Sequence, residues 1–256
     1  MSSIHFQSTY QLSNQYDDIK FRAPNILGNF LVDSNIYQFN DNDKTLTFRS
    51  ERLIPEKGSG RQRVLLLFSN PHPHSIQYGM FLSPSVTGRQ NLFWTGMLDA
   101  GWFSLPETKP GPKRLAEIFL NLEYESPFEV LFYCYYSFPT RYPEDLVKLF
   151  GKEFFQDVIV PQARDDFQKL IDQESLAAVV TFNKSIFNLV SKDAVDKYID
   201  RLKAGEVIRN EIKDSEIEVP IFLTYPTGWR YDPNHQEYRR KNLEKIKNLV
   251  LRVEEK

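Results

Sequence analysis

Four mostly apolar segments, separated by helical segments, restrict the possible folds of this chain more than any other feature. Each contains a run of strand length with few polar side chains, which is typical of a strand buried on both faces of a parallel sheet. The four segments are 64–68, 128–138, 176–183 and 218–228. Such strands with helices between them form one mainly parallel sheet covered on both faces. We therefore expect an α/β fold with three layers, α/β/α, around a mainly parallel four-stranded central sheet.

The first 60 residues differ from the rest of the chain. They are rich in Asn, Asp, Ser and Gln and are interrupted by proline and glycine. Apolar and polar residues alternate over 45–53 (TLTFRSERL), which predicts a half-exposed strand. We expect residues 1–60 to form an N-terminal extension packed on the core, and residues 61–256 to form one α/β domain.

Composition limits the possible partners. With 32 Lys and Arg against 34 Asp and Glu, the formal net charge is −2, which argues against coating nucleic acid through the overall field. Candidate cations for a local basic surface cluster at 109–114 and 239–247. No apolar run is long enough to cross a bilayer, and the first ten residues lack the pattern of a secretory leader. We expect a cytoplasmic protein with no membrane partner.

Cysteine and histidine usage argues against several other kinds of chemistry. Cys134, the one cysteine, excludes a disulfide or a four-cysteine metal site within this chain, and its apolar surroundings favour a packing role. No carboxylate lies beside the pair His72 and His74 at a metal-ligand spacing, so we expect no bound metal. Neither a glycine-rich phosphate loop nor a Gly-x-Ser-x-Gly motif is present, which makes dehydrogenases, kinases and serine hydrolases poor candidates.

Two of the predicted strands end in polar residues and proline. FSNPHPHS (68–75) follows the first strand, and TYPTGW (224–229) follows the last. Ligands bind at the carboxyl ends of strands in parallel sheets, where a rigid turn can hold side chains against a substrate. Both segments are therefore candidate sites, and the alternative is that both are simple turns.

Three motifs, in this order, resemble those of the uracil-DNA glycosylase superfamily, particularly its mismatch-specific and single-strand-selective branches. FSNPHP (68–73) is similar to the strand-end motif Gly-x-Asn-Pro-Gly, or Gly-x-Asp-Pro-Tyr-His in the classical branch. YGMFLSPSVTGRQNLFWTGMLDAGWF (78–103) is similar to a Gly and a Phe followed by NRFW, a Leu and AGF. YPTG (225–228) is similar to the His-Pro-Ser-Pro or Asn-Pro-Ser-Gly motif after the last strand. The resemblance covers about residues 61–251.

The resemblance implies a uracil-DNA-glycosylase-like fold for residues 61–256 and a monofunctional DNA glycosylase that acts in base excision repair. Such an enzyme hydrolyses the N-glycosidic bond of uracil or another altered base in DNA and needs no cofactor. The implied partner is DNA, either single-stranded or a mismatched duplex, and we expect the protein to act as a monomer.

Two residues take the catalytic positions in this resemblance. Asn70 matches the family's Asp or Asn, which orients the attacking water. An amide takes no proton at neutral pH, so Asn70 is not a strong general base, and slow turnover or dependence on a good leaving group such as uracil follows. Tyr225 replaces the His or Asn of the last motif, and its hydroxyl is expected to donate to a base oxygen.

The implied base pocket contains four residues. Phe81 matches the family's stacking Phe to within one position, with Leu82 as the competing alignment; an aromatic face returns part of the stacking energy that an extruded base loses. His72 falls where the classical branch has the Tyr that excludes a methylated pyrimidine, and it shapes the pocket or contacts phosphate. Tyr133 falls at the base-recognition position, commonly Asn. A hydroxyl lacks the paired donor and acceptor of an amide, which weakens the case for uracil selectivity.

The loops after the first and last strands form the implied DNA-binding surface. Its residues are Ser69, Pro71, Pro226, Thr227, Gly228, Trp229 and Arg230. Gly228 permits close approach of a backbone, and the loop from Pro226 to Arg230 is expected to press on the DNA backbone or fill the vacated stack. The alternative for Trp229 is that it anchors the terminal helix.

A function of another class fits the same residues. A catalytically silent member of this fold would bind nucleic acid or a protein partner through its aromatic and basic loop ends. Taken singly, Phe81 also fits ordinary core packing, and His72 also fits a solvated turn residue. The altered positions Tyr133 and Tyr225 favour this alternative, whereas the retained Asn70-Pro71 pair and the NLFW segment favour the glycosylase. A closed groove at Asn70 would argue against both.

Overall fold

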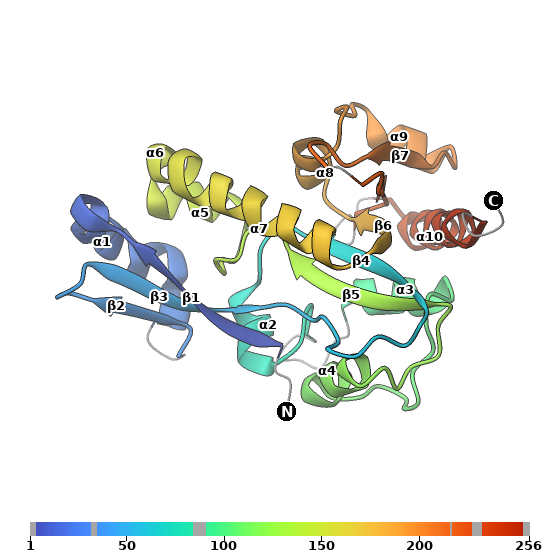
Figure 1. Cartoon of the computed structure of the whole chain (residues 1–256), viewed down its shortest axis with the longest axis horizontal. Coiled ribbons are helices and arrows are strands. Elements are labelled where there is room, and N and C mark those ends of the chain that lie inside the picture. Colours follow the sequence, from blue (N-terminus) through green and yellow to red (C-terminus); the bar gives the residue numbers. More distant parts are fainter. Residues whose placement is uncertain (1–3, 32–34, 84–90, 216, 227–231, 253–256) are drawn as a thin grey trace.

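A five-stranded sheet forms the centre of the fold (Figure 1). The computed structural model describes residues 4–31, 35–83, 91–215, 217–226 and 232–252. The strand order is β5-β4-β6-β8-β7; the first four strands run parallel, and β7 is antiparallel to β8. The strands are β4 (Gln62–Phe68), β5 (Phe128–Cys134), β6 (Leu176–Thr181), β7 (Ile208–Glu211) and β8 (Pro220–Leu223). The mainly parallel sheet expected from the sequence is confirmed.

The edge strand β7 corrects the expected number of four strands. It has four residues, of which only Ile208 is buried, and it lies at the end of the sheet. The sequence predicts a helix across 192–205, whereas α9 covers only Tyr198–Lys203. A short edge strand with one buried side chain gives almost no periodicity, and so the sequence pattern did not reveal it.

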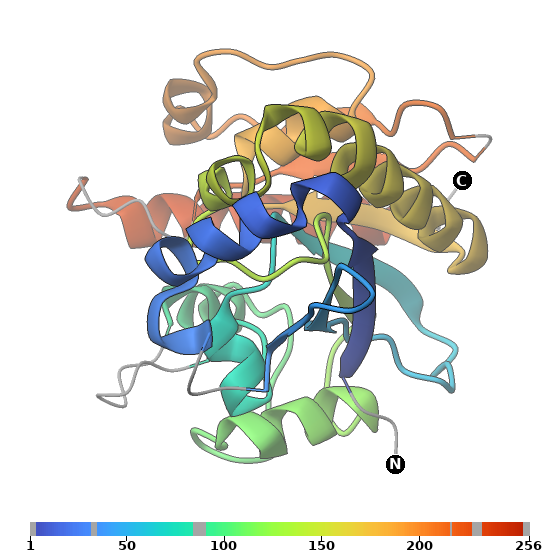
Figure 2. The ribbon, with the colours of Figure 1, turned by 90° about the vertical axis from the view of Figure 1, so that its left-hand side faces the viewer.

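Helices cover both faces of the sheet and give the three-layer arrangement (Figures 1 and 2). Side chains alternate in direction along β4: Val64 and Leu66 pack against α3, α4 and α10, whereas Leu65 and Leu67 pack toward α5, α7 and α8. These helices are α3 (Leu92–Asp99), α4 (Pro112–Leu120), α5 (Glu144–Phe150), α7 (Val160–Gln173), α8 (Lys184–Val190) and α10 (His235–Leu251). The buried part of β4, from Val64 to Leu67, is apolar at every position because helices cover it on both faces.

Shorter helical segments complete the layers. The helical stretch predicted across 143–171 is interrupted at Gly151, whose φ of 81° ends α5. The short segments are α2 (Pro73–Tyr78), α6 (Lys152–Phe154), a π-helical turn (Phe155–Ile159) and two 3₁₀ turns (Ser13–Gln15 and Gly28–Leu31). No helix in the described ranges is both long enough and apolar enough to cross a membrane.

The N-terminal residues form a second, antiparallel sheet in the order β1-β3-β2, together with α1 (Figure 2). The elements are β1 (His5–Gln11), α1 (Tyr16–Leu27), β2 (Tyr37–Asn40) and β3 (Thr45–Glu51). The predicted half-exposed strand is confirmed as β3. Phe48 lies 4.8 Å from Phe138, ring centroid to ring centroid, so this sheet shares its core with the central sheet.

The order of the strands opens a crevice at the carboxyl ends of β4 and β6. From β4 the chain passes to β5 on one side and later to β6 on the other. The connecting helices therefore leave the sheet on opposite faces, and ligands of parallel sheets bind where this change of direction occurs. The segment 68–75, a candidate site from the sequence, follows β4 at this position.

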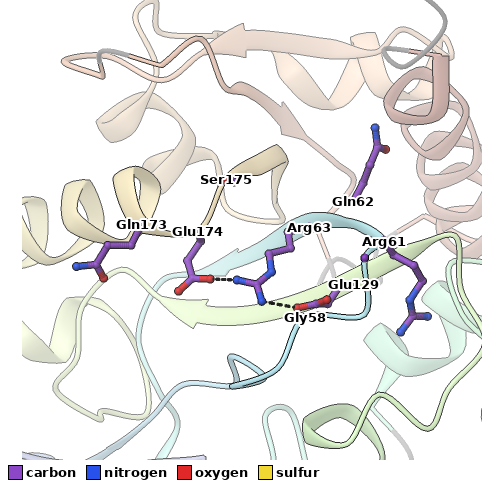
Figure 3. Close-up of a pocket in the computed structure, with 9 residues that line it drawn as sticks. Gly58, Arg61, Gln62, Arg63, Glu129, Gln173, Glu174 and Ser175 are labelled. Atoms are coloured by element: carbon purple, nitrogen blue, oxygen red, sulfur yellow. Dashed lines mark hydrogen bonds and ion pairs between the residues drawn. The ribbon is translucent and has the colours of Figure 1, made fainter.

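At the amino-terminal edge of the sheet, Arg63 lies between two carboxylates (Figure 3). Its Nη2 is 2.9 Å from Oε1 of Glu129, and its Nη1 pairs with Glu174. Glu129 is fully buried, and its Oε2 accepts hydrogen bonds from the backbone N–H (2.7 Å) and hydroxyl (3.0 Å) of Ser59. The cluster borders a cavity of about 380 Å³. Because its charges are paired with one another, we interpret it as the attachment of the loop before β4 to the sheet.

The substitution Arg63→Met is expected to lower the free energy of unfolding by about 3–5 kcal/mol, because it leaves the Glu129 carboxylate buried without its cation. Urea titration measures this loss. Glu174→Gln, which changes the more exposed carboxylate, is expected to cost less. Equal effects of the two substitutions would contradict a central role for the buried pair.

Candidate functional site

A cavity of about 760 Å³ lies at the carboxyl ends of β4, β5 and β6. This volume falls within the range of about 300–1,000 Å³ that is typical of small-molecule sites. The lining comes from the end of β3, the segments after β4, β5 and β6, and the connection between α2 and α3. Five residues predicted from the sequence line it together, namely Ser69, Asn70, His72, Phe81 and Leu82.

Hydrogen bonds to Thr140 fix the side-chain amide of Asn70. Asn70 Nδ2 donates to the carbonyl oxygen and the hydroxyl oxygen of Thr140, both at 2.9 Å, and to the carbonyl of Pro71 at 3.1 Å. The Thr140 hydroxyl donates in turn to the carbonyl of Tyr142 at 2.8 Å, so it accepts from Asn70. Carbonyl oxygens only accept, and the amide therefore has one possible orientation. In the described part of the chain no hydrogen bond occupies Asn70 Oδ1.

Backbone hydrogen bonds join the loop after β4 to the loop after β5. The Ser69 carbonyl accepts from the N–H of Tyr136 at 2.8 Å, and the Pro71 carbonyl accepts from the N–H of Thr140 at 3.1 Å. Pro71 is buried. These two predicted DNA-binding residues thus help to position Asn70, and of the two only Ser69 lines the cavity.

His72 is a neutral hydrogen-bond donor at the cavity wall. It caps α2, where its Nδ1 accepts from the backbone N–H of His74 at 3.1 Å. In the neutral ring the proton then lies on Nε2. Burial, with smaller contributions from His74 and Arg141, lowers the pKa of His72 to about 4. A ring that is neutral at pH 7 fits a role in shaping the pocket better than a cationic contact to phosphate.

Aromatic rings form one wall of the cavity. The rings of Phe68 and Phe182 are parallel within 2°, with centroids 5.9 Å apart, and Phe81 lies 5.8 Å from Phe68. Phe81 is 2% exposed and also packs against Phe132, so it belongs both to the core and to the wall. Phe68 is only half-buried. It is therefore a better candidate than Phe81 to present a face to a ligand.

Leu82, the competing alignment for the stacking residue, has an unusual backbone conformation. Its φ is +50°, in a region of backbone conformation that residues other than Gly rarely adopt. The indole N–H of Trp94 donates to its carbonyl at 3.1 Å. This bond attaches the lining to α3, which begins after Asn91 as N-cap. The NLFW segment (91–94) therefore holds this part of the cavity lining in place.

An acidic side chain, Glu51, lines the cavity at the end of β3. It is 2% exposed, and its Oε2 has no hydrogen-bond partner among the described residues. An antiparallel bridge between Leu53 and Phe132 aligns the chain after β3 with β5. Glu51, two residues before Leu53, and Cys134, two residues after Phe132, both line the cavity. Burial raises the pKa of Glu51 well above its ordinary value, which favours the neutral carboxylic acid.

The cavity rim carries exposed polar and aromatic groups. Arg141 and Tyr142 follow Thr140, and the guanidinium carbon of Arg141 lies 5.5 Å from the centre of the Tyr142 ring. Tyr142 is 50% exposed. A cation beside an exposed ring is an arrangement that suits a nucleic-acid strand, since it offers both a phosphate contact and a stacking face.

Tyr133 does not line this cavity. It lies on β5 opposite Leu67, and its side chain joins the core on the sheet face that α7 covers. The neighbouring Cys134 lines the cavity instead. Because side chains alternate along a strand, an alignment shifted by one residue exchanges one face for the other. Tyr133 is therefore better explained as core, and burial raises its pKa far above the ordinary value.

The last motif lies apart from Asn70. Tyr225 follows β8, which β6 separates from β4 in the sheet, and it is fully buried against Tyr238 of α10 with its hydroxyl unpartnered in the described structure. It is not among the described lining of the cavity. The carbonyl of Pro226 accepts from Arg239 Nη2 at 2.7 Å. The other predicted DNA contacts, Thr227, Gly228, Trp229 and Arg230, lie outside the described residues.

Several lining residues were not singled out from the sequence. Phe182 and Asn183 directly follow the third strand, and Thr140 follows the second, so the rule that ligands bind at strand ends could have identified them. Glu51 gave no such indication. It lies on the polar face of an alternating strand, and only the docking of that strand on the core buries it.

The described part of the chain holds no cluster of metal-binding side chains. There, no three His, Cys, Asp or Glu side chains come together in a way that could hold a metal ion. No family model matches the chain, and no curated protein matches it. Proposals about function therefore depend on the geometry of the cavity itself.

Glu51→Gln is expected to flatten the pH dependence of folding stability. In the wild type the unfolded chain releases the Glu51 proton near the ordinary pKa of 4.5, while the folded chain retains it. Stability is therefore fully present below that pH and falls as the pH rises. An amide has no such proton. Urea titrations between about pH 4.5 and pH 8 should show that the variant gains stability relative to the wild type, and a constant difference would contradict this account.

Proposed function

We propose that this protein is a DNA glycosylase that hydrolyses the N-glycosidic bond of uracil or another altered base in DNA. One observation carries the proposal: an asparagine amide held in a single orientation beside a cavity with an aromatic wall. Nδ2 of Asn70 is occupied by Thr140, and Oδ1 remains available at the strand end where parallel sheets bind ligands.

The chemistry needs a positioned water rather than a strong base. As the N-glycosidic bond breaks, its electron pair moves to the base, the sugar develops positive charge, and water oxygen forms the new bond to C1′. Asn70 Oδ1 accepts a hydrogen bond from this water and directs the lone pair of the water oxygen toward the sugar. Since the amide takes no proton, the water proton passes to solvent, and the reaction depends on a base that leaves readily as an anion.

Groups in the cavity meet the needs of the leaving base. An extruded base loses stacking energy, and the half-buried Phe68 offers a face that returns part of it. The Nε2–H of neutral His72 is a donor for a base oxygen on which negative charge develops. Both requirements are met without a charged group inside the cavity.

The outer rim suits the DNA strand. Arg141 and Tyr142 are exposed beside the cavity, where a guanidinium can contact phosphate and a ring can stack on a base. Single-stranded or mismatched DNA fits this arrangement, because its bases leave the stack at low cost.

A catalytically silent nucleic-acid-binding protein is the second candidate. It is favoured by the placement of Tyr133 and Tyr225, neither of which lines the described cavity. Such a protein would retain the rim and the aromatic wall but release no base. A single-turnover assay therefore separates the two candidates.

Asn70→Ala is expected to reduce base release by about 10²–10³-fold, the usual effect of removing one fixed polar group from a transition state. The measurement is release of free base from oligonucleotides carrying uracil, hypoxanthine, xanthine or a mismatched thymine, with enzyme in large excess. Asn121→Ala is the matched control, because Asn121 is exposed at the end of α4, away from the cavity. Loss in both variants would contradict a specific role for Asn70, and no release by the wild type would favour the silent alternative.

Arg141→Gln is expected to weaken binding to all these oligonucleotides to a similar degree and to lower the slope of log affinity against log salt by about 1. The reason is that one phosphate contact is lost, whereas base recognition is not. Fluorescence anisotropy over a salt series measures both quantities. An unchanged slope would show that Arg141 does not contact phosphate.

A further inference from the structure

The hydrolysis proposed above leaves Glu51 without a role. Glu51 is 2% exposed and lines the cavity, and its Oε2 has no hydrogen-bond partner in the described part of the chain. No described residue forms an ion pair with it. An isolated polar group of this kind costs folding free energy, so a purely structural purpose does not explain its place in the cavity lining.

We propose that Glu51 recognises the base held in this cavity, with one carboxyl oxygen donating a hydrogen bond to a base carbonyl and the other accepting from the adjacent base N–H. The ligands of this class are bases with a lactam edge, in which C=O lies beside N–H. Uracil, hypoxanthine and xanthine share this edge. The inference rests on the proposed function for the identity of the ligand as a nucleobase.

The chemistry of a neutral carboxylic acid matches this edge. Burial favours the protonated form of Glu51, and a protonated carboxyl carries a donor and an acceptor side by side. This is the pair that a hydroxyl such as that of Tyr133 cannot offer. The same cavity has an apolar wall formed by Phe68 and Phe81, and in apolar surroundings the two hydrogen bonds are stronger than in water.

The position of Glu51 also fits the leaving group. Asn70 and Glu51 reach the same cavity from different elements, the loop after β4 and the end of β3. In this arrangement Asn70 serves the water at the sugar, and Glu51 holds the base. A donated O–H on the base carbonyl also stabilises the charge that develops there when the base departs as an anion.

Two substitutions at Glu51 separate recognition from a structural role. Glu51→Gln keeps a neutral donor and acceptor on a side chain of the same length. Glu51→Met keeps the length but has neither group, and it removes a buried unpaired carboxyl, so its thermal midpoint is expected to equal or exceed that of the wild type. A loss of binding in Glu51→Met is then not a loss of folding.

The binding arm compares two oligonucleotides of one sequence. One contains 2′-fluoro-2′-deoxyuridine, in which the electron-withdrawing fluorine disfavours positive charge on the sugar and slows hydrolysis; the other contains a tetrahydrofuran abasic site. Wild type and Glu51→Gln are expected to prefer the uracil strand about tenfold more strongly than Glu51→Met does, as two net hydrogen bonds predict, since stacking on Phe68 and the His72 donor are common to all three proteins. A preference in Glu51→Met equal to that of the wild type, or no preference in the folded wild type, would overturn the inference.

The release arm tests the proposed function separately, with ordinary deoxyuridine under single-turnover conditions. Base release by the wild type together with undiminished base preference in Glu51→Met would leave the glycosylase standing and refute the role of Glu51. No release, together with a base preference that depends on Glu51, would refute the glycosylase and leave a base-binding cavity whose recognition residue is Glu51.

Discussion

The hydrogen bonds between the loop after β4 and the loop after β5 hold the candidate site together. They continue the parallel ladder beyond the strands, through Ser69 and Pro71, and they end at the Asn70 side chain on Thr140. An exposed asparagine amide would rotate between orientations that offer either its oxygen or its nitrogen. Here the backbone carbonyl of Thr140 selects the orientation in which Nδ2 donates to Thr140. Oδ1 is therefore the atom that remains available, and the site offers an acceptor.

Neutral groups are a second common feature of the cavity. Burial lowers the pKa of His72 and raises those of Glu51 and Cys134, so all three side chains favour their uncharged forms. The cation Arg141 lies outside, at the rim. Under the proposed function, the cation at the rim would contact the phosphate backbone and the uncharged interior would hold the extruded base.

The sequence predicted the fold class and one half of the site. Continuous apolar runs identified the strands of the sheet, because burial on two faces is encoded locally. The rule that ligands bind at the carboxyl ends of parallel strands identified the segment that contains Asn70. Tyr133 does not line the described cavity, whereas its neighbour Cys134 does, because an alignment shifted by one residue changes the face of a strand. Glu51 could not be found in this way. Its burial comes from the packing of one sheet on another, and no local pattern encodes that packing.

The bridge from Leu53 to Phe132 also makes the N-terminal sheet part of the cavity and not an accessory to it. The cavity lining is completed by Glu51 at the end of β3, which precedes every strand of the central sheet in the sequence. The chain after β3 pairs with β5, which comes later in the sequence. The Tyr37 hydroxyl of β2 also donates to the carbonyl of Pro139, next to Thr140, so the N-terminal sheet supports the loop that fixes the Asn70 amide. Because Phe48 of that sheet and Leu65 of the central sheet belong to one core, opening of the N-terminal sheet would expose this core and remove Glu51 from the cavity lining at the same time.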